Sequence, residues 1–198
     1  MIKENTINKY IFGGGEIAES ISSILKIPIE KDTDVVNNKI EELYITSGFL
    51  NREPFFQQTY EEIYKSIDAN LIYPLKILTE LKKYIDKNTK IILISSSSSY
   101  NDREGYSVYS STKTALEIFA KTLYKEGYNI KLVRPARTDT KLRWDNISKA
   151  DKENWENLLT PEDIVKQLPS FLKSDYNYLN IFKSEEQLIT QLKDWEYE

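Results

Sequence analysis

Short apolar runs alternate with amphipathic segments along most of the chain. Runs of strand length, rich in β-branched or aromatic residues, predict strands at residues 10–12, 42–46, 90–95 and 128–133. The run at 90–95 is apolar almost throughout, which is typical of a parallel strand buried on both faces. A further apolar piece at 27–29 contains Pro28, so it is expected at a sheet edge or as an irregular segment.

Helical periodicity fills the segments between these runs. It predicts helices at residues 16–26, 56–84 and 108–125, the second with a break near Asp68 and with Pro74 inside it. Strand and helix therefore alternate in units of similar length. This alternation predicts a doubly wound, Rossmann-like α/β fold, in which a parallel sheet lies between two helical layers.

The last sixty residues continue this organisation without a linker. Thr160, followed by a proline and two acids, is typical of a helix N-terminus. Residues 176–198 contain a short strand candidate and an amphipathic helix. With no abrupt change of composition, residues 1–198 are interpreted as a single domain.

Composition and charge exclude several classes of protein. The chain has neither cysteine nor histidine, which removes disulfides, thiolate or imidazole metal sites, and Ser-His-Asp or cysteine catalysis. Its net charge of −4 argues against a nucleic-acid partner. No apolar run has the ~20 residues that cross a bilayer, and the N-terminus resembles no secretory signal, so no membrane partner and a cytoplasmic location are expected.

A glycine-rich turn joins the first predicted strand to the first predicted helix. Residues 13–18 fit the pattern G-x-G-x-x-A, in which small residues and the helix N-terminus receive a pyrophosphate. The pattern predicts cofactor contacts from Gly13, Gly15, Glu16 and Ile17.

Hydroxyl and amine groups follow the 90–95 strand. Five serines occupy residues 95–99, and Tyr109 and Lys113 lie four residues apart on one face of the next helix. Tyrosine needs a pKa lowered by roughly 3 units to exchange protons efficiently at neutral pH. A neighbouring ammonium supplies part of that shift. By itself, one such pair in a chain rich in tyrosine and lysine is a weak indication.

Together, these motifs resemble the short-chain dehydrogenase/reductase family. ILISS at 92–96 and YSSTK at 109–113 are similar to its serine and Y-x-x-x-K signature, with Ser96 thirteen residues before Tyr109. In the same order, ITSG at 45–48 resembles N-N-A-G, DANL at 68–71 the asparagine segment, VRPARTDT at 133–140 the P-G-x-V-x-T motif, and TPEDIV at 160–165 a late helix. The likeness covers about residues 8–182.

The resemblance implies a role for each matched residue. Tyr109 would be the acid or base, Lys113 would lower its pKa and hold the nicotinamide ribose, and Ser96 would bind the substrate oxygen. Asn70 would support a proton relay, and Thr140 would touch the nicotinamide carboxamide. Ser47, Gly48 and Pro135 complete the expected cofactor contacts.

The chain departs from the family pattern in three places. About thirty residues separate the glycine turn from the N-N-A-G-like turn, where the family has some seventy, so about one strand-helix unit is missing. The glycine turn is shorter than T-G-x-x-x-G-x-G, and Ala136 replaces the glycine of P-G. The missing unit normally shapes the adenosine half of the cofactor pocket, including the acidic residue that binds a ribose hydroxyl at the end of the second strand. The candidates for that residue here are Glu30, Asp32 and Asp34, and Lys31 could instead hold a 2′-phosphate. NAD is slightly favoured over NADP, although a solvated charge cluster explains these residues equally well.

A basic stretch ends in the segment 141–160, which covers the substrate in the family. Its members are Lys131, Arg134, Arg137, Lys141 and Arg143. They either hold an anionic substrate or cofactor phosphate, or are solvated surface charges. Trp144 and Trp155 are likewise lid residues or ordinary packing.

These observations predict an NAD(P)-dependent oxidoreductase that interconverts a small-molecule alcohol and carbonyl. One alternative is a catalytically degenerate dinucleotide-binding sensor or scaffold of the same fold. Nucleotide-sugar epimerase or dehydratase chemistry fits less well, because about sixty residues after Thr140 are too few for a substrate domain. The resemblance also implies a homodimer or homotetramer formed through the helices at 56–84 and 108–125.

Overall fold

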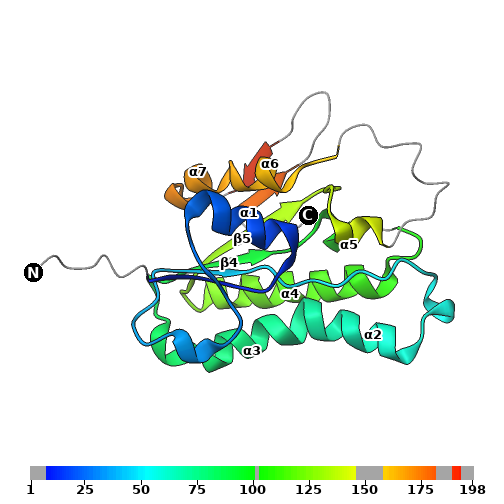
Figure 1. The fold of residues 1–198 in the computed structure, drawn as a ribbon, viewed down its shortest axis with the longest axis horizontal. Helices are drawn as coiled ribbons and strands as arrows, with labels where there is room; N and C mark the ends of the chain where they lie inside the picture. The colour runs from blue at the N-terminus through cyan, green and yellow to red at the C-terminus, as the bar shows by residue number, and fades with distance from the viewer. Residues whose placement is uncertain (1–7, 101–102, 146–157, 182–188, 193–198) are drawn as a thin grey trace, which may run out of the picture.

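A seven-stranded sheet with the order β2-β1-β3-β4-β5-β6-β7 forms the centre of the molecule (Figure 1). The computed structural model describes residues 8–100, 103–145, 158–181 and 189–192. The strands are β1 (Lys9–Phe12), β2 (Ile29–Glu30), β3 (Glu42–Ile45), β4 (Lys90–Ile94), β5 (Asn129–Pro135), β6 (Tyr178–Ile181) and β7 (Ile189–Leu192). Pairing is parallel from β2 through β6, and only β7 runs antiparallel to its neighbour. The predicted doubly wound parallel sheet is confirmed.

Helices cover both faces of this sheet, as expected for three layers (Figure 1). They are α1 (Gly15–Leu25), α2 (Tyr60–Ile67), α3 (Tyr73–Glu80), α4 (Ser107–Lys125), α5 (Lys141–Trp144), α6 (Pro161–Val165) and α7 (Leu168–Lys173). One face is packed by α1, α6 and α7, and the other by α3 and α4 with α2 beside them. Each face therefore has its own apolar core.

The strand residues alternate between these two cores. In β4, Ile91 and Leu93 join the core under α3 and α4, while Ile92 and Ile94 join the core under α1 and α6. All four side chains are buried, because a strand covered on both faces turns successive residues to opposite sides. The continuous apolar run of the sequence is explained by this two-sided burial.

The predicted helix 56–84 is interrupted where the sequence indicated. α2 begins after a capping box in which Thr59 and Glu62 bond to each other's backbone N–H groups. It passes into a single π-helical segment, Asp68–Ile72, and α3 follows with Pro74 in its first turn. A π-helical segment inside a helix often marks a functional site, and this one carries Asn70.

The connection from β2 to β3 is shortened. Residues 31–41 contain only the 3₁₀ turn Thr33–Val35, and β3 lies directly beside β1. Among the described residues no strand pairs with the other side of β2, so β2, two residues long, forms the edge of the sheet. The missing strand-helix unit predicted from the sequence is thus reflected in the topology.

The C-terminal region differs from one prediction. Residues 189–192, expected in an amphipathic helix, form the edge strand β7. The backbone groups of β6 that face away from β5 take up this pairing, which satisfies a strand edge that a helix would leave unpaired. Residues 146–157, which include Trp155 and much of the predicted covering segment, lie outside the described residues. No described helix has the length and apolar character of a membrane span.

Candidate active site

Two adjoining cavities open at the carboxyl ends of the central strands. The larger, with an empty volume of about 1380 Å³, is lined by the glycine turn, and the smaller, of about 700 Å³, by Tyr109 and Lys113. They share the lining residues Ile17, Thr46, Ser47, Gly48, Thr140 and Leu142. A ligand could therefore extend continuously from the glycine turn to Tyr109. This is the sheet edge at which open α/β proteins bind ligands.

The glycine turn offers exposed backbone at the beginning of α1. Gly13 has φ +126°, and a Cβ there would lie 2.5 Å from Thr46 Oγ1 and 2.7 Å from Ser47 N, so only glycine fits. A Cβ on Gly14 or Gly15 would meet no atom within 4 Å. Gly14 is the N-cap of α1 and places no side chain over the first N–H groups. These groups, together with the helix dipole, suit a pyrophosphate.

Two more features connect the glycine turn to the sequence predictions. The Glu16 carboxylate accepts a 2.6 Å hydrogen bond from Lys141 N and so fixes the start of α5 against α1. Glu30 and Lys31, at the end of β2, line the same groove, whereas Asp32 and Asp34 are not among its lining residues. The acidic residue expected at the end of the second strand is therefore present despite the shortened connection, and the residues fit a dinucleotide.

Lys113 is buried at the centre of the cleft. Its ammonium donates to Ile94 O at 3.1 Å and to Ser47 O at 3.4 Å, and the residue is only 3% exposed. Burial lowers its pKa to about 8, and the nearby Glu117 carboxylate opposes the shift. The side chain thus joins the ends of β3 and β4 while holding a cation whose proton is more easily lost than usual.

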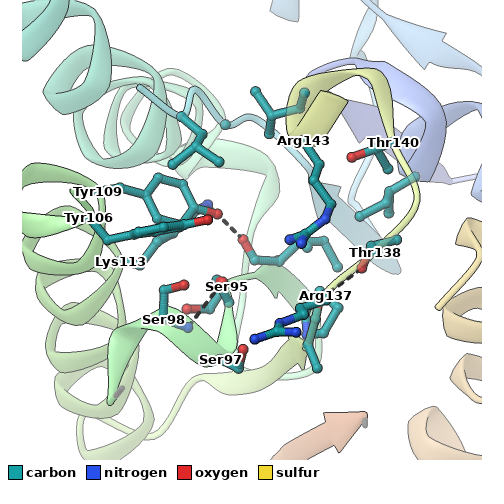
Figure 2. A pocket seen from close by; sticks show the side chains of 18 of the residues that line it. Ser95, Ser97, Ser98, Tyr106, Tyr109, Lys113, Arg137, Thr138, Thr140 and Arg143 are labelled. Carbon is teal, nitrogen blue, oxygen red and sulfur yellow. Dashed lines mark hydrogen bonds between the residues drawn. The ribbon is translucent and has the colours of Figure 1, made fainter. Parts of the chain in front are cut away.

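Tyr109 lies beside this lysine and faces the same cavity (Figure 2). Lys113 Nζ is 5.9 Å from the centre of the tyrosine ring. Desolvation raises the pKa of Tyr109 to about 12, although a hydrogen bond with Ser96 acts in the opposite direction. The lowering of this pKa that the resemblance implied for Lys113 is not found: burial and Tyr106 raise it, and the opposing effects come from Ser96 and Arg103, so the phenol form is the favoured one here.

Ser96 and Asn70 complete the predicted set. Ser96 caps the turn Ser97–Ser99, and its Oγ accepts from Ser98 N at 3.1 Å. Asn70 is fully buried; its Nδ2 donates to Phe49 O at 2.8 Å and to Ser66 Oγ at 3.1 Å, and its Oδ1 accepts from Phe49 N at 3.1 Å. Asn70 thus fixes the loop after β3, and Gly48 of that loop lies between Asn70 and Lys113.

Sequence reasoning missed a buried ionic cluster directly behind the cleft. Glu117, fully buried on α4, accepts from Arg134 Nε at 2.8 Å, from Ser95 Oγ at 2.5 Å and from Tyr178 Oη at 2.9 Å, and forms an ion pair with Arg134 Nη2. The Arg134 guanidinium also stacks 3.8 Å from the Tyr178 ring centre. The signal was the spacing of Tyr109, Lys113 and Glu117, which lie four residues apart on one helical face.

The basic stretch divides into two groups with different roles. Lys131 and Arg134 are buried, Lys131 donating to the carbonyl groups of Ser174 and Tyr176, so neither is a surface charge nor a ligand contact. Lys141 lines the glycine-turn groove. Arg137 and Arg143 extend into the Tyr109 cavity from the side opposite Tyr106 and Tyr109 (Figure 2). Neither interpretation of the basic stretch, an anion site or solvated surface charges, therefore holds for all five residues, because the strand buries two of them.

Most of the predicted residues meet in this cleft. Those that line it are Gly13, Gly15, Glu16, Ile17, Ser47, Gly48, Ser96, Tyr109, Lys113, Pro135 and Thr140. Asn70 contacts it through Phe49 and Gly48. Arg103 and Tyr106, which the sequence did not indicate, line the Tyr109 cavity as well.

Comparison with solved structures agrees with the fold. An alcohol dehydrogenase from the archaeon Thermococcus sibiricus, complexed with 5-hydroxy-NADP, superposes with a TM-score of 0.74 over 91% of this chain and 98% of that one, at 14% identity. A small-chain dehydrogenase in complex with NADPH gives 0.72 over 88% and 96%, at 13% identity. A glucose/ribitol dehydrogenase from Brucella melitensis gives 0.70 over 83% and 88%, at 15% identity.

Sequence comparison identifies the family. A curated relative, the bifunctional ribulose 5-phosphate reductase/CDP-ribitol pyrophosphorylase of Haemophilus influenzae, is 32% identical over 111 residues, which is 54% of this chain. The matched part spans only 23% of that relative's length. The family model for short chain dehydrogenases matches residues 30–151. With the glycine turn, the tyrosine-lysine pair and the parallel sheet in place, the chain, with its shortened β2–β3 connection, belongs to the short-chain dehydrogenase/reductase family.

Proposed function

We propose that this protein is an NAD(P)-dependent oxidoreductase that interconverts an alcohol and a carbonyl, with Tyr109 as the proton donor or acceptor. The observation that carries the proposal is one continuous cleft, in which the glycine turn lies at one end and Ser96, Tyr109 and Lys113 at the other. Dinucleotide and substrate would then meet beside a hydroxyl group that can exchange a proton.

A nicotinamide dinucleotide bound along the glycine turn would supply or accept the hydride at the substrate carbon. In reduction, the substrate oxygen takes its proton from the Tyr109 hydroxyl, and Ser96 donates a hydrogen bond to the same oxygen. Because burial raises the pKa of Tyr109 to about 12, its hydroxyl is protonated at neutral pH, as a proton donor in reduction must be. Lys113, charged below its pKa of about 8, stabilises the phenolate that remains.

We propose that Asn70 mainly positions other groups of the site. Both hydrogens of its amide group bond within the chain, to Phe49 O and Ser66 Oγ. They hold the loop after β3, whose Ser47 carbonyl accepts from Lys113. Asn70 would therefore keep Lys113 in position through that loop, and with it the proton transfer at Tyr109.

The first substrate to test is ribulose 5-phosphate, because the curated relative carries a ribulose 5-phosphate reductase activity in its name. The purified protein is titrated calorimetrically with NADH and NADPH, and turnover is then followed by loss of reduced cofactor. Tyr109→Phe is expected to bind the dinucleotide like the parent and to lose about 10²–10⁴-fold in rate, as removal of a general acid does.

The possible outcomes separate the proposal from its alternative. Dinucleotide binding with turnover that Tyr109→Phe abolishes supports the oxidoreductase. Binding without turnover on any carbonyl substrate would favour the catalytically degenerate sensor or scaffold. If neither dinucleotide binds, the shortened β2–β3 connection has removed the cofactor site, and the proposal is wrong.

We further propose that the protein forms a homodimer or homotetramer through α2 and α4. Tyr60, Tyr64 and Ile67 on α2 and Ile118 and Tyr124 on α4 are exposed, and the two helices pack beside each other. Apolar side chains gathered on neighbouring helices are typical of a protein-protein interface. Light scattering of the parent protein should give a mass that is a multiple of the 23.2 kDa chain mass, and Tyr64→Lys should lower this mass. A monomeric parent protein would contradict the proposal.

A further inference from the structure

Arginine side chains gather at the end of the cleft that lies away from the glycine turn. Arg103, Arg137 and Arg143 line the Tyr109 cavity, and none of them lines the glycine-turn groove. Arg52 lies just behind, because its Cζ and that of Arg103 approach the Tyr106 ring centre to 5.7 and 5.9 Å. Four of the five arginines of the chain therefore surround one region.

These cations are close enough to affect one another. Burial lowers the pKa of Arg143, and Arg137, Arg103 and Arg52 lower it further, in that order, against an opposing effect of Tyr106. Within the described ranges, Arg103 and Arg137 form no ion pair with a carboxylate, in contrast to Arg134 with Glu117. The cluster is thus a concentration of positive charge next to an open cavity, in a protein whose net charge is −4.

The surroundings suit a compact anion with several acceptor oxygens. Guanidinium groups bind phosphate through paired hydrogen bonds, and several of them match a dianion better than a single carboxylate. Ser97 and Ser98 line the same cavity and add hydroxyl groups. Figure 2 shows the Arg137 and Arg143 side chains extending into the space that Tyr109 faces.

The location separates this region from the cofactor phosphates. The N-terminus of α1 and the glycine turn, where a pyrophosphate would bind, line the other cavity, as do Glu30 and Lys31. An anion beside Arg137 would instead share its cavity with Ser96 and Tyr109. It would therefore belong to the substrate, a few bonds from the carbon that reacts.

We propose that Arg103, Arg137 and Arg143 form a phosphate subsite that selects phosphorylated hydroxy-ketones or polyols as substrates. The proposal rests on the proposed oxidoreductase function for the reaction itself, but the subsite can be tested without turnover. It replaces the anion site expected from the basic stretch, because Lys131 and Arg134 are committed to the protein interior and Arg103 comes from the loop before α4.

The binding test uses inorganic phosphate and dihydroxyacetone phosphate as probes, titrated calorimetrically into the protein. We expect saturable binding that weakens about tenfold or more in Arg137→Ala, as loss of a hydrogen bond between charged groups does, and further in Arg103→Ala/Arg137→Ala. Lys173→Ala, which removes an exposed cation at the end of α7, is the matched control and should bind like the parent. Circular dichroism and Tm confirm that each variant is folded.

The kinetic test compares dihydroxyacetone with its phosphate, which differ only in the charged group. The ratio of their kcat/KM values should favour the phosphate in the parent protein and fall at least tenfold in Arg137→Ala. Phosphate binding that is the same in parent and arginine variants would overturn the subsite, as would tighter binding of a three-carbon hydroxycarboxylate than of the phosphate. Arginine-dependent phosphate binding without any reductase activity would instead refute the proposed function and leave the subsite standing.

Discussion

The two halves of the sheet support the candidate site in different ways. β4 and β5 are five and seven residues long. Arg134 of β5 and the α4 residues Lys113 and Glu117 are charged and buried in this half. β1 and β2 are four and two residues long, and they end in a glycine turn whose Gly14 and Gly15 are exposed. The proposed proton chemistry lies at the first half and the proposed cofactor phosphates at the second.

The comparison indicates which half of the site needs accurately positioned side chains. A group that exchanges protons must be held at a defined position in a defined dielectric environment, which requires a rigid and satisfied interior. A pyrophosphate is bound by backbone N–H groups, which a short turn and one helix end provide. Substitutions in the β4–β5 half should therefore change folding stability and pH dependence, whereas those in the β1–β2 half, apart from the closely packed Gly13, should mainly change ligand affinity.

Glu117→Gln should have the largest effect on stability. It leaves the Arg134 guanidinium buried without its counter-charge, while Ser95 and Tyr178 lose a carboxylate acceptor. Breaking one side of a buried ion pair costs about 3–5 kcal/mol. Urea unfolding of parent and variant, followed by circular dichroism, measures the loss.

The control for this prediction replaces both charges. Glu117→Met/Arg134→Met removes the pair instead of leaving one charge alone, and such exchanges are often neutral or stabilising. It should therefore recover most of the stability that Glu117→Gln loses. A double variant as unstable as the single one would mean that the hydrogen bonds of the cluster, and not its charge balance, hold the β4–β5 half together.

Lys113→Met should reveal a stability difference that depends on pH. Burial lowers the pKa of Lys113 from its ordinary value to about 8, so between about pH 8 and pH 10 the unfolded chain binds more protons than the folded one. The stability of the parent therefore rises through this window, by an amount on the order of 3 kcal/mol in total. The variant lacks this rise.

The measurement compares the free energy of unfolding of both proteins at pH 7, 8, 9 and 10. The advantage of Lys113→Met over the parent should shrink as the pH rises. Tyr109, whose pKa is raised to about 12, titrates above the window in the folded state of both proteins, so the difference reports on Lys113. Parallel curves would show that burial does not lower the pKa of Lys113.

Gly13→Ala and Gly14→Ala form a matched pair in the β1–β2 half. At Gly13, φ is +126° and the new Cβ would collide with Thr46 and Ser47, so about 1–3 kcal/mol of stability should be lost. At Gly14 the new Cβ enters open space, so stability should change by less than about 0.5 kcal/mol. NADH or NADPH binding, if it follows the turn, should still weaken by about tenfold, roughly 1.4 kcal/mol. Equal affinity of Gly14→Ala and parent would place the dinucleotide elsewhere.

Sequence reasoning was most successful where local chemistry and periodicity agreed. The two-sided burial of β4, the break near Asp68 and the cap at Thr160 each follow from residues within one turn or one strand of the feature. The shortened β2–β3 connection could be predicted because it changes the count of residues between two motifs. The meeting of Ser96, Tyr109 and Lys113 in one cleft was implied by the resemblance of the ordered motifs to the family.

Long-range partners could not be predicted in the same way. In the sequence, Arg134 is one member of a basic stretch. In the fold it contacts Glu117, which lies seventeen residues earlier in the chain and on another element. Arg103 joined the arginine cluster only because the loop before α4 turns toward Arg137 and Arg143. Residues 189–192 pair with β6 through backbone groups, and side-chain periodicity carries little information on such pairing.

Cofactor preference should show the smallest effect and lies wholly in the β1–β2 half. Glu30 and Lys31 line the groove at the end of β2 and carry opposite charges. A carboxylate accepts hydrogen bonds from ribose hydroxyls and repels a 2′-phosphate, whereas an ammonium attracts it. We expect NAD to be favoured because Glu30 is half-buried and Lys31 exposed.

The matched variants Glu30→Gln and Lys31→Gln test this balance. Glu30→Gln should lower the ratio of NADH to NADPH affinity and Lys31→Gln should raise it. Each change should be only about twofold to fivefold, since exposed charges contribute less than about 1 kcal/mol. Calorimetric titrations at two salt concentrations would measure both ratios, and the differences should diminish at the higher one. If neither variant changes the ratio, the ribose lies outside the reach of these side chains, and the charges at the shortened edge of the sheet do not discriminate between NAD and NADP while the glycine turn still binds the pyrophosphate.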